Sequence, residues 1–204
     1  MRTGIFGGSF DPVHFGHIYP VAECRAYLNL DQIIYIPAFQ PPHKPKRKLE
    51  DPLHRHAMLA LALQSIPYAR IDNREIISEK PVFTIDSVKQ IRAETSDEIF
   101  LLIGSDNLAI LNTWHKHMEL ISLCRIMVLV RPGCPFASAT EKLPEELASV
   151  CEPFGSGIRT FPHDPIDLSS SDIRTRLSEG KPVTGLTPKS VENYIMRYRL
   201  YAQT

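Results

Sequence analysis

The 204-residue sequence has few cysteines, no net charge and no long apolar segment. Its four cysteines are spread along the chain without CxxC spacing, which argues against a disulfide scaffold. Because 23 Lys and Arg residues balance 23 Asp and Glu residues, no overall field attracts nucleic acid or an anionic membrane. No apolar run reaches membrane-spanning length, and the N-terminus lacks a signal-peptide pattern. We therefore expect a cytoplasmic protein with reduced thiols.

The sequence also lacks the two commonest phosphate-binding motifs, GxxxxGK[ST] and GxGxxG. Instead, the stretch GGSFDPVHFGH follows an apolar run at residues 7–17. A glycine-rich turn between a first strand and a first helix can cradle phosphate with its backbone N–H groups. His14 and His17 would start the helix and project from one face, and Gly16 between them would let a ligand approach the backbone.

Three interpretations of the two histidines compete. They could satisfy buried polar groups, or they could bind a metal, although no Cys or acidic partner stands nearby at ligand spacing. They could also donate hydrogen bonds to phosphate oxygens as charge builds on a phosphoryl group. The preceding glycine turn favours the third interpretation, with no metal ligand supplied by the protein.

Short β-branched runs alternate with longer amphipathic stretches along the chain. This alternation predicts an α/β fold, with a doubly wound, Rossmann-like and mostly parallel sheet and helices on both faces. No repeat or linker is visible, so we expect one domain over residues 1–204 with a C-terminal helical part over about 168–204. The expected strands are 3–7, 32–37, 69–76, 98–104, 124–130 and 158–162, and the expected helices include 15–28, 51–66, 83–94, 143–150, 170–180 and 188–200.

Distinctive motifs follow four of these strands. They are GGSFDPVHFGH, PAFQPPHK at 37–44, GSDN at 104–107 and RPG at 131–133. In a doubly wound sheet, ligands bind at the carboxyl ends of the strands. The clustering of motifs at strand ends therefore indicates one binding site.

A second candidate phosphate motif, LSSSDIR, occupies residues 168–174. Ser169 and Ser170 can cap a helix whose free N–H groups face an anion. Arg174, one turn on, offers a forked cation suited to a polyphosphate. Alone, this stretch would be an ordinary helix cap, but its pairing with GGSFDPVHFGH makes a nucleotide site the better interpretation.

These two stretches resemble the paired signatures of the nucleotidyltransferase superfamily with an (H/T)xGH motif and an SSTxxR motif, with Ser171 in place of the commoner threonine. Three further segments resemble the bacterial nicotinate-nucleotide adenylyltransferase family. PAFQPPHK is similar to its PxxxPPHK, FTIDSV at 83–88 to its SYTIDTL, and GSDNLAILNTWHKHMEL at 104–120 to its GxDxLxxLxxW. Phe83 stands where the family has tyrosine.

The resemblance implies adenylyl transfer from ATP, which carries Mg²⁺, to nicotinate mononucleotide, giving deamido-NAD and pyrophosphate in NAD biosynthesis. Trp114 would stack on the pyridine ring, and backbone N–H groups near Thr84 and His115 would face its carboxylate. Asp106 would accept from the ribose hydroxyls, cap the following helix, or do both. The resemblance implies four catalytic residues, which supply charge neutralisation: His14, His17, Lys44 and Arg174. The implied ATP-binding residues are Gly7, Gly8, Ser9, Phe10, Gly16, Gly104, Asp106, Ser169, Ser170 and Ser171. The implied substrate-binding residues are His43, Thr84, Trp114 and His115, with Arg55 and Arg131 as weaker candidates.

Other functions stay open at this stage. The acceptor could be nicotinamide mononucleotide or phosphopantetheine, although PPHK and Trp114 argue against the latter. A non-catalytic nucleotide sensor is disfavoured by the retained histidines, Lys44 and Arg174. RNA binding through the basic run HKPKRK at 43–48 lacks an accompanying aromatic module, so we expect neither nucleic acid nor membrane as a partner. A homo-oligomer is neither indicated nor excluded.

Overall fold

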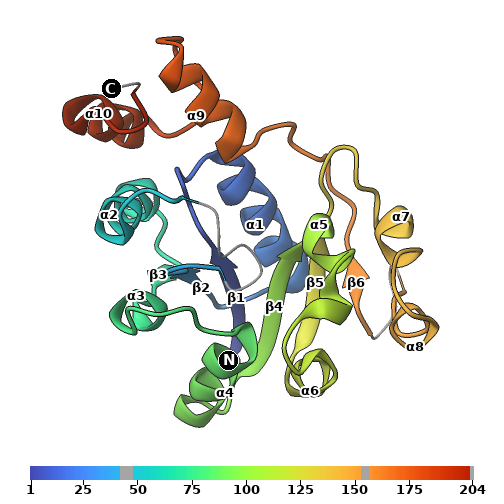
Figure 1. Cartoon of the computed structure of the whole chain (residues 1–204). Helices are drawn as coiled ribbons and strands as arrows, with labels where there is room; N and C mark the ends of the chain where they lie inside the picture. The colour runs from blue at the N-terminus through green and yellow to red at the C-terminus, as the bar shows by residue number, and fades with distance from the viewer. Residues whose placement is uncertain (42–47, 153–156, 203–204) are drawn as a thin grey trace.

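The computed structural model describes residues 1–41, 48–152 and 157–202, and within them one sheet has the strand order β3-β2-β1-β4-β5-β6 (Figure 1). Every neighbouring pair of these strands is parallel. The expected doubly wound α/β fold is therefore confirmed. The strands are β1 (Arg2–Gly8), β2 (Gln32–Pro37), β3 (Ala69–Ile71), β4 (Glu98–Gly104), β5 (Arg125–Leu129) and β6 (Arg159–Thr160).

The strand order reverses between β1 and β4. The chain moves outward from β1 to β2 and β3, and then returns to place β4 on the other side of β1. The loops that follow β1 and β4 therefore diverge and leave a crevice at the carboxyl ends of these strands, where doubly wound sheets bind ligands. Phe6 of β1 lies opposite Leu102 of β4, so the two strands end at the same level along the sheet.

Helices cover both faces of the sheet. Because strand side chains alternate between faces, Phe100 and Leu102 enter a core with α1, α2 and α10, while Leu101 and Ile103 enter a second core with α4 and α6. The helices are α1 (Phe15–Leu28), α2 (Pro52–Leu63), α3 (Arg74–Ile77), α4 (Thr84–Glu94), α5 (Ser105–Leu108), α6 (His117–Leu123), α7 (Phe136–Thr140), α8 (Glu145–Ala148), α9 (Ser170–Ser178) and α10 (Lys189–Tyr198), with a 3₁₀ turn η1 (Leu111–Thr113).

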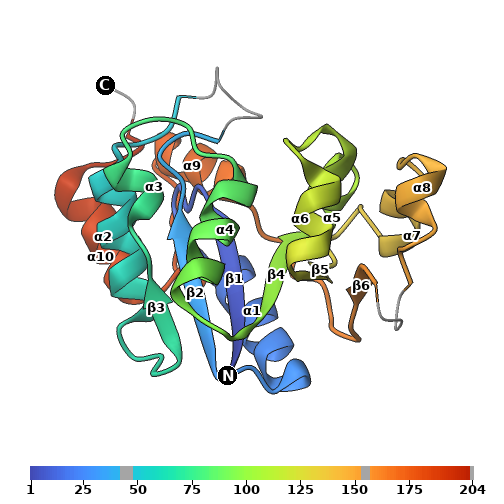
Figure 2. The same cartoon turned by 90° about the horizontal axis from the view of Figure 1, so that it is seen from below.

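The two C-terminal helices pack on the first half of the chain. α10 lies beside α2 in both views, on the opposite side of the molecule from α7 and α8 (Figures 1 and 2). Val191 and Ile195 of α10 are buried in the same core as α1 and α2, and Ser190 Oγ donates to the Leu61 carbonyl at 3.1 Å. This packing brings the end of the chain close to the loop after β1.

Two local expectations need correction. The strand expected over 69–76 ends at Ile71, because Asp72 accepts from the Arg74 N–H at 2.9 Å and so starts the short helix α3. The helix expected over 51–66 ends earlier, at Leu63. Its expected N-cap is confirmed, because Asp51 Oδ1 accepts a hydrogen bond from Leu53 N at 2.7 Å.

All four cysteines are free thiols. Burial raises the pKa of Cys24 and of Cys124 to about 12, so neither thiol is reactive near neutral pH. In the ranges that the structure covers, no helix has the length and apolarity that crossing a membrane requires.

Arg55 is fully buried and its guanidinium joins three segments around the crevice. It donates to the carbonyls of Ser9 and Ala38 at 2.7 Å each, and to those of Phe39 and Glu50 at 2.9 Å each. Burial lowers the pKa of Arg55, and the nearby Asp11 acts in the opposite direction. Because all these donors are used within the protein, Arg55 holds the loops after β1 and β2 together. These contacts account for the burial of Arg55 within the protein and give no support to its weaker candidacy as a ligand-binding residue.

Candidate active site

A cavity opens at the carboxyl ends of β1 and β4, at the point where the strand order reverses. Its wall combines the loop after β1, the start of α4, the segment after β4 and the start of α9. Fourteen of the residues expected from the sequence line it: Gly7, Gly8, Ser9, Phe10, His14, His17, Thr84, Gly104, Asp106, Trp114, Arg131, Ser169, Ser170 and Ser171. Gly16, His115 and Arg174 are not in its lining, and His43 and Lys44 lie outside the described residues.

The two histidines lie side by side at the start of α1. His14 is the N-cap and His17 stands in the first turn, and their ring centroids are 3.8 Å apart. Both rings are buried and line the cavity. Within the described residues, the Nδ1 atom of each ring is buried without a hydrogen-bond partner. A buried polar atom without a partner is costly, which marks this pair as a functional feature.

Burial also sets the charge of this pair. Desolvation, followed by the charge of Arg131, lowers the pKa of His14 from 6.5 to about 3, although Asp172 acts in the opposite direction. Desolvation, His14 and Arg131 lower the pKa of His17 well below its usual value. Both imidazoles are therefore neutral at pH 7 in the free protein. In this state they offer N–H donors without a net charge, and their role at phosphate stays a prediction.

Aromatic packing fixes the position of His17. Phe10 is 1% exposed and its ring meets the His17 ring edge to face at 5.2 Å, with Phe6 and Tyr35 packed behind it. To place its ring there, Phe10 adopts a left-handed backbone conformation with φ of 48°. This conformation is costly for a residue other than glycine, and the burial of the ring compensates for it.

Gly16 is required for a different reason from the expected one. A Cβ atom at this position would lie 2.9 Å from His14 Nδ1 and 3.2 Å from the Leu168 carbonyl oxygen. The missing side chain makes room for the His14 ring and for the segment that precedes α9. This close packing between the two motifs explains the glycine, and the approach of a ligand to its backbone stays a prediction.

An ion pair covers the backbone after β4. Asp106 Oδ1 lies 3.1 Å from Arg131 Nε, and both residues line the cavity. A Cβ atom at Gly104 would lie 2.7 Å from Arg131 Nε, so glycine lets the pair fold over the strand end. Asp106 makes no cap bond, because the N-cap of α5 is Gly104 and no side chain caps the helix. Its contact with a ribose stays a prediction.

The start of α9 docks directly on the loop after β1. Ser169 is the N-cap, as expected, and its Oγ accepts from Asp172 N at 3.1 Å. Ser170 Oγ donates to the Pro12 carbonyl at 3.0 Å. Arg174 Nη1 donates to the Asp11 carbonyl at 2.7 Å. Two motifs from opposite ends of the chain therefore meet at one cavity, although Arg174 stands beside the lining residues and not among them.

Another part of the cavity wall is formed by the start of α4 and the segment after β4. Thr84, the first residue of α4, and the half-buried Trp114 line it. The His115 ring is exposed and packs on Phe83, with centroids 4.4 Å apart. The His115 side chain therefore faces away from the lining, and the predicted role of its backbone N–H stays a prediction.

Sequence analysis missed one acidic group in this part of the wall. Glu75 lines the cavity and accepts a hydrogen bond from Ser87 Oγ at 2.7 Å. Burial raises the pKa of Glu75. No signal in the sequence marks it, because its segment was expected to be the end of a strand, where a single Glu carries no information about a site.

The chain is similar to a protein-family model, to several named relatives and to a solved structure. A family model described as cytidylyltransferase-like matches residues 5–176. A chain from Thermoanaerobacter sp. (strain X514) named "Probable nicotinate-nucleotide adenylyltransferase" is 35% identical over 203 residues, which cover 98% of this chain and 94% of that one. A chain of the same name from Chromobacterium violaceum is 38% identical over 208 residues, with 98% of each chain covered. The structure of Plasmodium falciparum nicotinic acid mononucleotide adenylyltransferase complexed with NaAD has the same fold, with a TM-score of 0.77, 18% identity, and 98% of this chain and 97% of that chain covered.

The lowered pKa of His14 predicts a specific pH dependence of stability. Below pH 6.5 the unfolded chain gains a proton at this histidine, whereas the folded chain stays neutral until the pH approaches about 3. Its contribution therefore makes the free energy of unfolding fall by about 1.4 kcal/mol per pH unit on acidification below 6.5. We expect His14→Gln to lose less stability than the parent protein between pH 6.5 and pH 5, measured by urea unfolding. Equal losses in the two proteins would contradict the neutral state of His14.

Proposed function

Since this chain belongs to the cytidylyltransferase-like family of nucleotidyltransferases, we propose that it transfers the adenylyl group of ATP to nicotinate mononucleotide, giving deamido-NAD and pyrophosphate for NAD biosynthesis. One observation carries the proposal. The histidine pair, the Ser169–Ser171 helix start, Thr84 and Trp114 all line the same cavity. The cavity therefore offers donors for phosphates next to an aromatic platform for a ring.

The proposed reaction needs no general base. The 5′-phosphate of the acceptor attacks the α-phosphorus of ATP in line, and pyrophosphate leaves from the opposite side. The attacking phosphate is already largely anionic near neutral pH, because its second pKa is about 6. The work of the protein is to hold two anions together and to stabilise charge on the transferred group.

Neutral imidazoles suit this task. His14 and His17 are held by the helix start and by aromatic packing, so their N–H groups need little reorganisation when charge develops on the α-phosphate. Positive charge must then come from elsewhere. We assign it to Arg174 beside the helix start and to Lys44, whose position is outside the described residues.

We propose that magnesium enters with ATP as part of the substrate. Among the described residues, no group of three His, Cys, Asp or Glu side chains converges on a point where a metal could bind. Magnesium is commonly held by phosphate and water oxygens with few protein ligands, which fits this wall. When bound to ATP, it supplies charge neutralisation on the triphosphate.

We propose that the pyridine ring of the acceptor stacks on Trp114, with its carboxylate near the N-terminus of α4. The backbone N–H groups at a helix start favour an anionic substituent over a neutral amide. Nicotinamide mononucleotide is the alternative acceptor within the same chemistry. The proposed setting is the cytoplasm, with these small molecules as partners.

Release of pyrophosphate with Mg-ATP tests the acceptor. We expect strong turnover with nicotinate mononucleotide and at least about tenfold lower kcat/KM with nicotinamide mononucleotide, since one charge-assisted hydrogen bond is worth about 1.5–3 kcal/mol. Phosphopantetheine should be inert. Faster turnover with the amide would support adenylyl transfer but contradict the proposed acceptor. No pyrophosphate release with any of the three acceptors would favour a nucleotide sensor.

Replacement of one histidine tests the phosphate role. We expect His17→Ala to lower kcat by about 100-fold or more, in line with the loss of one preorganised donor, with a smaller change in KM. His56→Ala on α2 is the matched control, because His56 is outside the cavity lining. A His17→Ala enzyme with a kcat close to that of the control would refute the role.

A further inference from the structure

The C-terminal end of the chain reaches the site through Tyr201, beyond the segment that the family model matches. That match ends at residue 176. After α10 ends at Tyr198, the chain turns through Arg199 and Tyr201, both with positive φ, and Leu200 between them is buried in the core. This turn directs the Tyr201 hydroxyl to Asp11, where it donates to Oδ1 at 2.9 Å.

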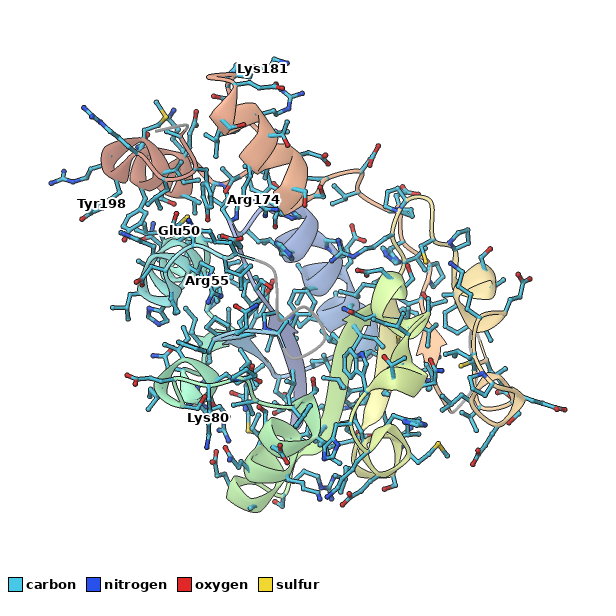
Figure 3. The ribbon with its side chains drawn as sticks, in the orientation of Figure 1. Glu50, Arg55, Lys80, Arg174, Lys181 and Tyr198 are labelled. Carbon is cyan, nitrogen blue, oxygen red and sulfur yellow. The ribbon has the colours of Figure 1, made fainter. Side chains whose placement is uncertain are left out.

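Asp11 receives contacts from three separate segments. Its side chain is 1% exposed within the loop after β1. Oδ1 also accepts from Glu50 N at 3.3 Å, next to the start of α2. On the other side, Arg174 Nη1 of α9 lies 3.5 Å from Oδ2 and donates to the Asp11 backbone carbonyl at 2.7 Å. Glu50 and Arg174, together with Arg55, lie where α2 and α9 approach each other (Figure 3).

The two oxygens of this carboxylate are therefore divided between different partners. Tyr201 and the Glu50 N–H occupy Oδ1, so Arg174 meets the carboxylate only through Nη1 and Oδ2. A free Asp–Arg pair prefers the bidentate arrangement, in which two N–H groups face both oxygens. Here Arg174 Nη2 donates instead to Ser171 Oγ at 3.1 Å, and Ser171 lines the cavity.

The Tyr201 hydroxyl can make this contact across the working pH range. Burial, followed by the charge of Asp11, raises the pKa of Tyr201, so the hydroxyl keeps its proton. Among the described residues, the charged and titratable groups that interact with it are Asp11, Glu50, Arg174 and Arg55. Neither cation replaces this donor at Oδ1 without moving, because Arg174 is tied to the Asp11 carbonyl and Arg55 donates to four other carbonyls.

We propose that Tyr201 is a positioning residue for adenylyl transfer: by occupying Asp11 Oδ1, it prevents a bidentate Asp11–Arg174 pair and keeps the Arg174 guanidinium directed to Ser171 and the phosphates of ATP. This inference rests on the proposed function, because it assumes that Arg174 contacts the triphosphate. It assigns a task at the site to the last helix and turn, whose other contacts are with the core of α1 and α2.

Tyr201→Phe tests the proposal with the loss of one oxygen atom. Arg174 should then pair with both oxygens of Asp11, and the KM for Mg-ATP should rise by roughly 3- to 10-fold, the effect of one typical hydrogen bond. The KM for nicotinate mononucleotide should change by less than about twofold. Tyr198→Phe is the matched control, because it removes the same atom from a half-exposed side chain of α10.

A double-mutant cycle with Arg174→Lys separates positioning from a merely structural role. Lysine cannot form a bidentate pair, so Tyr201→Phe should add little to the KM for Mg-ATP in the Arg174→Lys background. An equal increase in both backgrounds, or an increase in KM for both substrates, would show that Tyr201 acts through the fold and would overturn the proposal.

The same cycle distinguishes failure of the inference from failure of the proposed function. If Arg174→Lys raises the KM for Mg-ATP and Tyr201→Phe does not, the inference is wrong and the phosphate role of Arg174 stands. If Arg174→Lys changes neither kcat nor KM, that role is wrong and the inference fails with it.

Discussion

The burial of the His14–His17 pair at the reversal point of the sheet is the constraint on which the site depends. Desolvation removes the positive charge from both rings, and the Arg131 cation opposes its return. Rings that are neutral and closely packed can remain side by side at 3.8 Å, whereas two imidazolium ions at this distance would repel each other. In the proposed reaction, these rings serve as neutral donors at the reacting phosphate, and the charged groups lie at its edge.

The histidine loop is held by segments from the other end of the chain. Thr187 Oγ1 donates to the Val13 carbonyl at 2.8 Å, and Phe15 N donates to the Leu186 carbonyl at 3.1 Å. Together with the contacts of Ser170 and Arg174, these bonds satisfy the backbone on both sides of His14. The loop that carries the histidines is therefore held by α9 and by the segment between α9 and α10. This links the geometry of the site to the folding of the whole chain.

Sequence reasoning predicted the sheet, its parallel strands and the meeting of the two motifs, because these follow from periodicity and from the position of motifs at strand ends. It did not predict the charge of the histidines, since a pKa depends on burial and on Arg131, which is far away in the sequence. It assigned Arg55 to a ligand, because the same residue type can serve phosphate or four carbonyls, and only tertiary contacts distinguish them. Glu75 was missed because the Asp72 turn that ends β3 is a local hydrogen-bond effect.

The measurement that tests the central claim most directly is the ¹⁵N NMR spectrum of the histidine side chains at pH 6, with His14→Gln and His17→Gln used for assignment. At this pH an unperturbed histidine, with a pKa of about 6.5, would be mostly protonated. We expect the signals of His14 and His17 to show neutral imidazoles in the free protein, each with one protonated and one unprotonated ring nitrogen. Imidazolium signals from either ring would contradict the account, because the pair would then act as a charged clamp and not as neutral donors.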